Sequence, residues 1–472
     1  MRPGTTPGTT PGTTPETRRG SRPGMRPETR RGARPGLQAL AVLAAGLLLA
    51  GCAPGNGGAA REGAGSGGPA AQAGGGVATQ EPQAGGGTGE AVPHGYVEGA
   101  EEMPEQQSRL VLADGGPDGR AHVLDLLTGR TTAVADAPDV RDITDDGRYA
   151  YLTTGAGTLR VIDGGGWTVD HGDHVHYYRT AARELGTVTG RPPYEVHGDP
   201  AVTAVRSGDG TATLFDRARM DQGELVETGR LTGVAAVVPY RERLLVAQDG
   251  AVQVRDRTGG TVAEAGTCAD AEGTAVTRRG VVFGCADGAL LVTEKDGAFE
   301  GVRIRYPRGT EAGERAKAFR HRPGSSTLAA RAGKAGTWAL DVTARTWRLL
   351  KTGPVVAVCA TGEDTPVLSL TADGVLQAHD PRSGERTATG KLLTTQPAGS
   401  APRSPTPGGD AAGGSHGEAV AGAPVIQADT SRAYVNDPAG RTVHEIDYND
   451  DLRRARAFEP GFAPAHMTET GR

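Results

Sequence analysis

The chain has 472 residues, including 74 glycines, and only 4% of its residues are aromatic. Its formal net charge is −5 at pH 7, but the first 51 residues hold eight arginines against two glutamates, which leaves −11 for the rest. An acidic body argues against nucleic-acid binding and suits cation binding. The length allows two or three average domains or one long all-β domain.

The first 51 residues predict a lipoprotein signal peptide. Residues 1–36 are polar, proline-rich repeats that cannot form a core, and Met25 is a second candidate start. Arginines precede the apolar run Leu37 to Ala50, which is short for a membrane span. The run ends in Leu49-Ala50-Gly51-Cys52, which resembles a bacterial lipobox. We therefore expect secretion and anchoring to the outer face of the bacterial cell membrane through a lipid on Cys52. The alternative is an ordinary signal peptide with a chance cysteine.

Two further segments have the composition of disordered chain. Residues 52–93 are rich in Gly, Ala and Gln with almost no large apolar side chains, which is typical of a flexible tether. A Pro/Gly/Ser/Ala-rich stretch at about 394–418 predicts a disordered surface insertion. The folded body is therefore expected to span residues 94–472, with this insertion near its end.

From about residue 108 the sequence repeats one phrase, a pair of short apolar runs, each followed by an Asp and a Gly-containing turn. The first example is Arg109-Leu-Val-Leu-Ala-Asp followed by Ala121-His-Val-Leu-Asp. Eight units recur at roughly 30 to 45 residues, the period of a propeller blade, and no long helical periodicity competes. The expected fold is an all-β β-propeller with eight blades, seven being the alternative. The units lie at 109–129, 148–163, 211–216, 243–256, 280–292, 327–341, 367–380 and 432–447.

Both ends of the repeat region are incomplete. The first unit has no strand before Arg109 to take the innermost position, while an apolar piece from Phe458 to Met467 is left over at the C-terminus. Left alone, each end would expose an unpaired sheet edge. We therefore expect the N- and C-terminal strands to pair with each other and close the ring.

Besides Cys52, the chain contains three cysteines, which do not have the spacing of a structural zinc site. Cys268 and Cys285 bracket one predicted hairpin. They either form a disulfide, which would persist outside the cytoplasm, or remain free thiols. Cys359 lies in the apolar run Val355-Val-Ala-Val-Cys and is expected to be a buried small hydrophobe.

Three of the eleven histidines lie within six positions, in Asp170-His171-Gly172-Asp173-His174-Val175-His176. Side chains alternate along an extended segment, so His174 and His176 face the same way with the imidazole nitrogens that zinc prefers. The two aspartates can ligate an ion or orient the rings. His197 closes the same gap between repeats, about 170–200. A tetrahedral metal site drawn from this gap is expected, with copper and nickel as alternatives to zinc, and a solvated loop is the alternative to a site. Its candidate ligands are His171, Asp173, His174, His176 and His197.

The remaining histidines carry less weight. His122, His379 and His444 occupy strand phrases and are expected to be structural. His321 lies between two arginines, which disfavour a bound cation. His466 falls on the expected closing strand, where inner strands line a central channel, and is a further candidate ligand.

The repeats, the export signal and the histidine cluster together resemble the AztD-type zinc metallochaperones. These are secreted propellers that pass zinc to the solute-binding protein of an ABC importer. The resemblance covers roughly residues 95–472, and its first motif is the most specific. The motifs are Trp167-Thr-Val-Asp-His-Gly-Asp-His-Val-His-Tyr-Tyr, Val281-Val-Phe-Gly-Cys-Ala-Asp-Gly, Thr442-Val-His-Glu-Ile-Asp and Phe462-Ala-Pro-Ala-His.

Two positions depart from the family pattern. A His-Gly pair is replaced by Thr232-Gly233, and a Leu-His-Gly after the first cysteine is replaced by Ala271-Glu272-Gly273. Glu272 can still ligate zinc, whereas Thr232 is a poor ligand. The resemblance thus implies a divergent member.

The expected function is a lipid-anchored, monomeric zinc chaperone that delivers zinc to the solute-binding protein of an ABC importer and touches the membrane only through its lipid. The alternative is a propeller lipoprotein without metal that acts as a protein-interaction or cell-surface scaffold. An enzyme, such as a metal-dependent lyase or a quinone-cofactor dehydrogenase, is not expected. The sequence offers no nucleophile–base pair, and only Trp167, Trp338 and Trp347 are available to stack on a cofactor.

Overall fold

The structure is a computed structural model that describes residues 96–170, 174–394 and 422–472. These residues all belong to one compact unit, Gly87–Arg472. The predicted signal peptide, Cys52, the tether and residues 395–418 of the predicted insertion lie outside the described residues. His171 and Asp173 of the predicted metal site lie outside them as well.

Strands dominate the described part of the chain, which forms seven four-stranded and two three-stranded antiparallel sheets. From residue 140 onward the sheets contain, in chain order, β5 (Val140–Asp145), β6 (Tyr149–Thr154), β7 (Leu159–Asp163) and β10 (Arg183–Val188); then β11 (Glu195–Gly198), β12 (Val202–Arg206), β13 (Ala212–Asp216) and β14 (Glu227–Leu231). The next two contain β15 (Ala236–Tyr240), β16 (Arg243–Gln248), β17 (Ala251–Arg255) and β18 (Thr261–Thr267); then β19 (Thr274–Thr277), β20 (Gly280–Cys285), β21 (Gly288–Lys295) and β22 (Ala298–Arg305).

The C-terminal half continues the series. Its sheets contain β23 (Thr327–Ala332), β24 (Gly336–Asp341) and β25 (Thr346–Leu350); then β26 (Val355–Ala360), β27 (Val367–Thr371), β28 (Val375–His379) and β29 (Arg386–Lys391); then β30 (Ile426–Ala428), β31 (Ala433–Asp437), β32 (Thr442–Asp447) and β33 (Arg453–Phe458). The described helices are short, α1 (Arg217–Asp221) and the 3-10 turn η1 (Ala312–Glu314).

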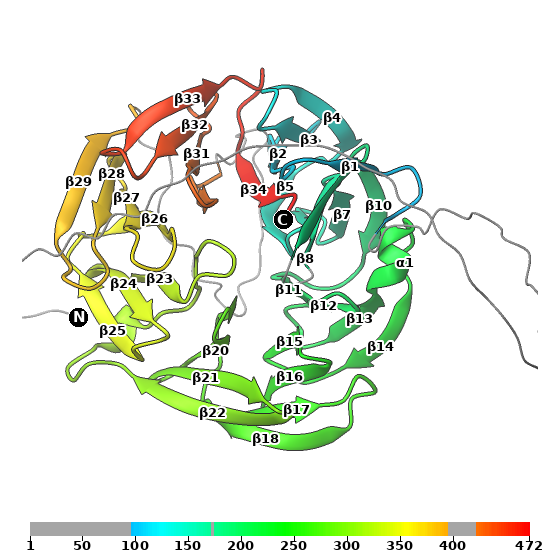
Figure 1. The fold of residues 1–472 in the computed structure, drawn as a ribbon, viewed down its shortest axis with the longest axis vertical. Helices are drawn as coiled ribbons and strands as arrows, with labels where there is room; N and C mark the ends of the chain where they lie inside the picture. Colours follow the sequence, from blue (N-terminus) through cyan, green and yellow to red (C-terminus); the bar gives the residue numbers. More distant parts are fainter. Residues whose placement is uncertain (1–95, 171–173, 395–421) are drawn as a thin grey trace, which may run out of the picture. The chain divides into compact units, whose positions relative to one another are not determined.

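These sheets follow one another around a closed ring, with the first strand of each toward the centre and the last at the rim (Figure 1). The fold is a β-propeller, as predicted. Six of the eight repeat phrases form the two middle strands of a sheet, for example β6 with β7 and β16 with β17. The phrase at 211–216 covers only β13, and the phrase at 327–341 forms β23 and β24 of a three-stranded sheet. The number of blades, eight, stays a prediction. The sheet β23–β25 has three strands, whereas the other sheets of the ring have four.

Burial explains why the middle strands are continuous apolar runs. All six residues of β6 and all six of β20 are buried, since each sheet is covered by a neighbour on both faces. The outer strand β29 is almost entirely exposed and correspondingly polar. The Asp that ends a phrase closes the next turn, as when Asp125 Oδ1 accepts the backbone N–H of Thr128 at 2.8 Å.

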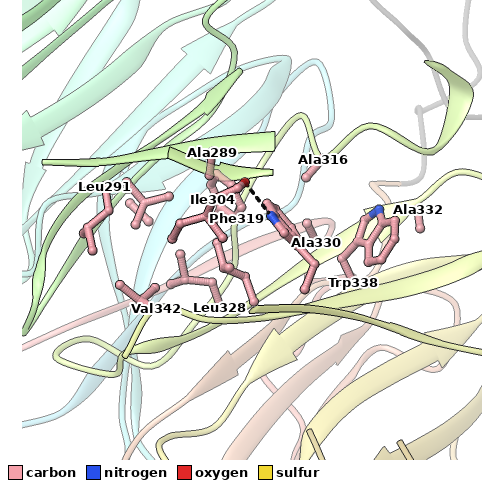
Figure 2. Close-up of a cluster of buried hydrophobic side chains, with 14 residues drawn as sticks. Ala289, Leu291, Ile304, Ala316, Phe319, Leu328, Ala330, Ala332, Trp338 and Val342 are labelled. Carbon is pink, nitrogen blue, oxygen red and sulfur yellow. Dashed lines mark hydrogen bonds between the residues drawn. The ribbon is translucent and has the colours of Figure 1, made fainter. Parts of the chain in front are cut away.

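Apolar clusters fill the space between neighbouring sheets. One of them joins β19–β22 to β23–β25, and two of the three tryptophans lie in it (Figure 2). Trp347 donates its indole N–H to the Ile304 carbonyl at 3.0 Å, and Trp338 donates to the Glu314 carbonyl at 2.6 Å. Each indole ring therefore packs within the core, and its N–H group has a hydrogen-bond acceptor there.

The chain ends close the ring. The C-terminal strand β34 (His466–Thr470) pairs with β2 (Arg109–Ala113), and β3 (Arg120–Asp125) and β4 (Thr131–Asp136) complete that sheet. Met467 is only 1% exposed, and beyond the strand Arg472 forms ion pairs with Asp145 and Glu469 at 2.6 and 3.1 Å. The predicted pairing of the N- and C-terminal strands is confirmed.

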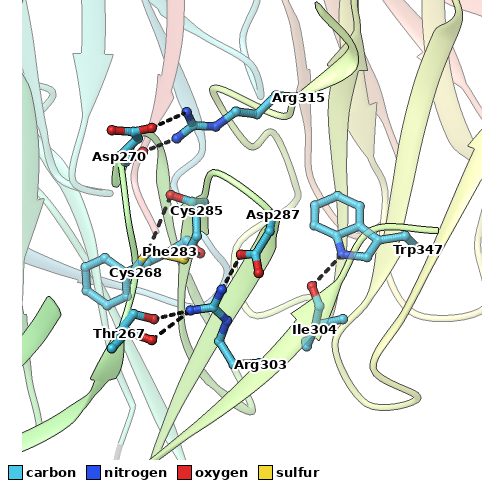
Figure 3. The surroundings of a disulfide bond; sticks show 11 residues. Thr267, Cys268, Asp270, Phe283, Cys285, Asp287, Arg303, Ile304, Arg315 and Trp347 are labelled. Carbon is cyan, nitrogen blue, oxygen red and sulfur yellow. Dashed lines mark hydrogen bonds and ion pairs between the residues drawn. A yellow bond between two sulfur atoms is a disulfide. The ribbon is translucent and has the colours of Figure 1, made fainter. Parts of the chain in front are cut away.

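A disulfide joins Cys268, just after β18, to Cys285 at the end of β20, so it links two neighbouring sheets (Figure 3). Arg303 reinforces the same seam, because its guanidinium donates to the Thr267 hydroxyl at 3.0 Å and pairs with Asp287. Cys359 is buried as a free thiol, in agreement with its predicted packing role.

We expect the Cys268→Ala/Cys285→Ala variant to lose about 2–4 kcal/mol of unfolding free energy, because the bond closes a 17-residue separation in the unfolded chain. Chemical denaturation followed by intrinsic fluorescence measures this loss. A reductant should shift the wild-type midpoint toward that of the variant and leave the variant unchanged. Equal midpoints for the oxidised wild type and the variant would contradict the prediction.

Candidate metal centre

The histidine cluster lies on a small sheet of its own. Strands β8 (Gly166–Asp170) and β9 (Val175–Arg179) form a hairpin, and β1 (Glu101–Met103) pairs with the other edge of β9. The described part of the gap between repeats is thus largely β-structure, and not a loop. His171 and Asp173 of the predicted ligand set are not among the described residues.

His174 and His176 come together as predicted. Their ring centroids lie 4.9 Å apart in an edge-to-face arrangement, which places both imidazoles on one side of the strand. His174 is exposed and the His176 side chain is 25% exposed, so both are accessible from solvent. Two accessible imidazoles on one face can supply two of the four ligands that a tetrahedral zinc site needs.

Glu102 contacts His176 and was not anticipated from the sequence. Its Oε1 lies 2.7 Å from His176 Nδ1, across the junction of β1 and β9. Register pairs Glu102 with Tyr178, so His176 is its diagonal neighbour, within reach of a long side chain. A carboxylate on one imidazole nitrogen is the arrangement that orients metal-ligating histidines.

The base of the hairpin is held by Arg109 of β2. One guanidinium nitrogen donates to the carbonyls of Gly164 and Thr180, at 2.7 and 3.2 Å, and so bridges the segments that enter and leave the hairpin. Gly165 at this point has φ +74°, and an added Cβ would lie 2.5 Å from the same nitrogen. Burial lowers the pKa of Arg109, although nearby Asp125 opposes the effect.

A second anchor connects the hairpin to the adjacent sheet. The Arg148 guanidinium lies 3.8 Å from the centre of the Trp167 ring and pairs with buried Asp163 at 3.0 Å. Burial alone would lower the pKa of Arg148, but Asp163, Tyr149 and Asp221 together hold it above its usual value. The cation therefore remains charged while it packs on the indole, which is favourable when desolvated.

The structure does not place His197 in the hairpin. It lies on β11, in the next sheet, where its Nε2 is 2.5 Å from the Thr274 hydroxyl and 3.3 Å from Glu195. The Thr274 hydroxyl donates its single hydrogen to Glu195 at 2.6 Å, so His197 Nε2 must itself carry a hydrogen. That nitrogen has no lone pair for a metal. Burial would raise the pKa of Glu195, but His197, Thr274 and Arg206 lower it to about 2.

The other two predicted ligands lie on further elements. Glu272 precedes β19 and forms an ion pair with Lys317 at 3.3 Å. His466 lies on β34, where it pairs with Ala113 of β2. Burial lowers the pKa of His466, although the negative charge of Asp142 acts to raise it. Among the described residues no group of three or more His, Cys, Asp or Glu side chains could hold a metal ion. Of the described members of the predicted set, the structure brings only His174 and His176 together.

No protein-family model matches the chain, and no curated protein matches it. Solved structures do. Apo AztD from Citrobacter koseri is 18% identical with a TM-score of 0.62, and the match covers 78% of this chain and 98% of AztD. A second crystal structure of Citrobacter koseri AztD is 19% identical with a TM-score of 0.62, covering 78% of this chain and 99% of that one. This chain shares its fold with AztD.

At this sequence identity the likeness to AztD shows a shared fold, and it does not identify metal ligands in this chain. The superposition covers nearly all of the AztD chain. Within residues 96–170, 174–394 and 422–472, no helix has the length and apolar character needed to cross a membrane.

Proposed function

We propose that the protein is a zinc chaperone of the AztD type, anchored outside the cell membrane by a lipid on Cys52. It would deliver zinc to the solute-binding protein of an ABC importer. The observation that carries the proposal is the pairing of His174 with His176 on one accessible face, in a chain with the AztD fold. The lipobox-like motif and the acidic body support the location and the affinity for a cation.

The chemistry of transfer favours this kind of site. A chaperone must hold zinc with few enough ligands that a recipient can add its own, and an exposed hairpin supplies ligands without enclosing the ion. His174 and His176 provide two imidazoles, and His171 and Asp173 are the proposed additional ligands. His197, Glu272 and His466 are not part of this proposed set, because each lies on a different element with partners of its own.

The decisive measurement is the zinc stoichiometry of the full-length protein, purified in detergent without a His tag and titrated in competition with a chelator. We expect about one zinc per chain, since the proposed set makes one tetrahedral site. Parallel titrations with Cu²⁺ and Ni²⁺ identify the metal, because imidazole sites accept all three. Absence of saturable zinc binding would contradict the proposal and favour a metal-free scaffold.

A further inference from the structure

We infer that a group of arginines at one end of the ring is a contact surface for anionic phospholipid headgroups of the membrane. The choice of partner rests on the anchoring in the proposed function, and nothing in the inference depends on zinc. The residues come from three turns of the neighbouring sheets β19–β22 and β23–β25 (Figure 1). We call them the arginine cluster: Arg278, Arg279, Arg322 and Arg345. The turns, 278–279, 322–326 and 342–345, contain no Asp or Glu.

Hydrogen bonds hold these three turns together. Arg278 Nε donates to the Gly324 carbonyl at 3.2 Å, and Arg279 Nε donates to the Thr343 hydroxyl at 3.2 Å. The Thr343 hydroxyl in turn donates to the Ser326 hydroxyl, also at 3.2 Å. The turns therefore form one continuous surface, on which Arg278 and Arg279 are exposed.

The guanidinium groups of Arg278 and Arg279 are held in place but not neutralised. Each uses its Nε for the hydrogen bond to the neighbouring turn. Within the part of the chain that the structure describes, the Nη atoms of these two side chains have neither a hydrogen-bond acceptor nor a carboxylate partner. Guanidinium nitrogens of this kind bind two oxygens of one phosphate group. Two such side chains, oriented in advance, are suited to phosphate.

A single carboxylate, Glu363, lies close to the cluster. It accepts a hydrogen bond from the Ser326 hydroxyl, which lowers the pKa of Glu363 although partial burial opposes the effect. The charges of three members of the cluster lower that pKa further, those of Arg278, Arg279 and Arg322. Because one negative charge faces three positive ones, the surface keeps a net positive charge on a protein that is acidic as a whole.

The chain enters the propeller at the same end of the ring as the cluster. Strands of a sheet alternate in direction, so the turn between its first and second strands lies at the same end as the connection between its third and fourth. The β19–β20 turn, with Arg278 and Arg279, is of the first kind, and the β8–β9 hairpin, inserted between β7 and β10, is of the second. Strand β1 pairs with that hairpin, and the described residues begin just before it, at 96. An anchor upstream of residue 96 thus favours contact between this end and the bilayer.

Electrostatic attraction would orient the propeller on the membrane. One arginine near an anionic bilayer shifts the binding equilibrium by about fivefold. The acidic remainder of the protein is repelled by the same surface, so the end with the cluster is the favoured side. A lipid chain combined with a basic patch is a recurrent way to hold a protein against a membrane.

The test places the full-length protein in vesicles of phosphatidylcholine, with or without phosphatidylglycerol. p-Hydroxyphenylglyoxal modifies accessible arginines, and mass spectrometry of peptides gives the rate at each position. With phosphatidylglycerol, Arg345 should react at least about fivefold more slowly. Salt at about 1 M, where the Debye length is about 3 Å, should remove this protection. Arg308 follows β22, the fourth strand of its sheet, and so lies at the opposite end of the ring, where its rate should be equal on both vesicles.

Two double variants test the charges themselves. Arg278→Gln/Arg279→Gln should lower the ratio of docked to undocked protein by about 30-fold, about fivefold for each arginine, and so abolish the protection of Arg345. The matched control is Arg308→Gln/Lys334→Gln at the opposite end, where charges more than a Debye length from the membrane are screened, and it should stay within about twofold of wild type. Thermal unfolding checks both folds, and the lipid and salt dependence of the wild type tests the inference without any variant.

Equal modification of Arg345 on the two kinds of vesicle would overturn the inference. Protection by inorganic phosphate in the absence of vesicles would assign the cluster to a free anion, and protection by polyglutamate but not by vesicles would assign it to an acidic protein. Either result removes the membrane as partner. Release of the protein from phosphatidylcholine vesicles would contradict the anchor alone, because phosphatidylglycerol vesicles still show whether the cluster binds. Zinc affinity should be the same in Arg278→Gln/Arg279→Gln and wild type, so a failure of zinc binding is read separately.

Discussion

Removal of the last ten residues, Ala463–Arg472, is expected to abolish the cooperative unfolding transition of the propeller. Strand β34 supplies the innermost strand of the sheet that contains β2, and it pairs with β2 at five positions. Met467, Thr468, Glu469 and Thr470 are each at most 1% exposed. No other strand among the described residues takes that place, so the deletion opens the ring.

The energetic cost has several sources that act together. The backbone groups of β2 lose their partners, and each buried group left unpaired costs about 1–3 kcal/mol. The cluster around Leu112 and Phe458 loses Met467, and removal of such a side chain alone costs about 2–5 kcal/mol. Asp145, whose side chain is 14% exposed, also loses Arg472, its partner at 2.6 Å. These losses equal the whole stability of a typical domain, about 5–15 kcal/mol.

Differential scanning calorimetry on the truncated and intact chains measures the effect. A graded series strengthens the result: Met467→Ala should cost about 2–5 kcal/mol, and the control Met103→Ala on the exposed strand β1 less than about 1 kcal/mol. An intact transition at the wild-type temperature in the truncated chain would show that β34 is dispensable and that the ring does not depend on it.

The sequence predicted the propeller because its middle strands carry an unusually simple signal. Strands such as β6 and β20 are buried on both faces, so their apolar runs stand out between the Asp- and Gly-containing turns that follow them. Closure was also predictable, since a C-terminal segment was left over and a strand was missing before Arg109, but the closing strand is His466–Thr470 and overlaps the predicted apolar piece Phe458–Met467 only at its end. Both conclusions depend on local composition, which a single sequence displays directly.

The sheet of the candidate site gives no such signal. β1 is only Glu101-Glu102-Met103, and β9 reads Val-His-Tyr-Tyr-Arg, which is neither a continuous apolar run nor a regular alternation. The contact of Glu102 with His176 joins strands that are far apart in the chain, and nothing in the sequence relates them. Only the fold brings the two side chains together.

His197 shows the opposite error, in which nearness in sequence was mistaken for nearness in space. It lies 21 positions after His176, but strand β10 intervenes and belongs to the preceding sheet, while His197 belongs to the next. Its partner Thr274 comes from 77 positions further along. Side chains from inner strands of different sheets thus meet each other, and a histidine that looked available as a ligand is engaged in a network with Glu195.

Replacement of both His174 and His176 by Ala is expected to abolish saturable zinc binding, a loss of at least about 100-fold in affinity if each imidazole contributes as a zinc ligand usually does. The hairpin should remain folded, because its pairing and its anchors at Arg109 and Arg148 do not involve either ring. Zinc titration against a competing chelator measures the loss, and thermal unfolding checks the fold. His321→Asn, in which a histidine that contacts the Val276 carbonyl is replaced far from the hairpin in sequence, serves as the control for loss of an imidazole. Full zinc affinity in the double variant would move the metal site elsewhere and leave the hairpin without its proposed role, whereas loss of zinc binding in the double variant alone would place zinc on the hairpin.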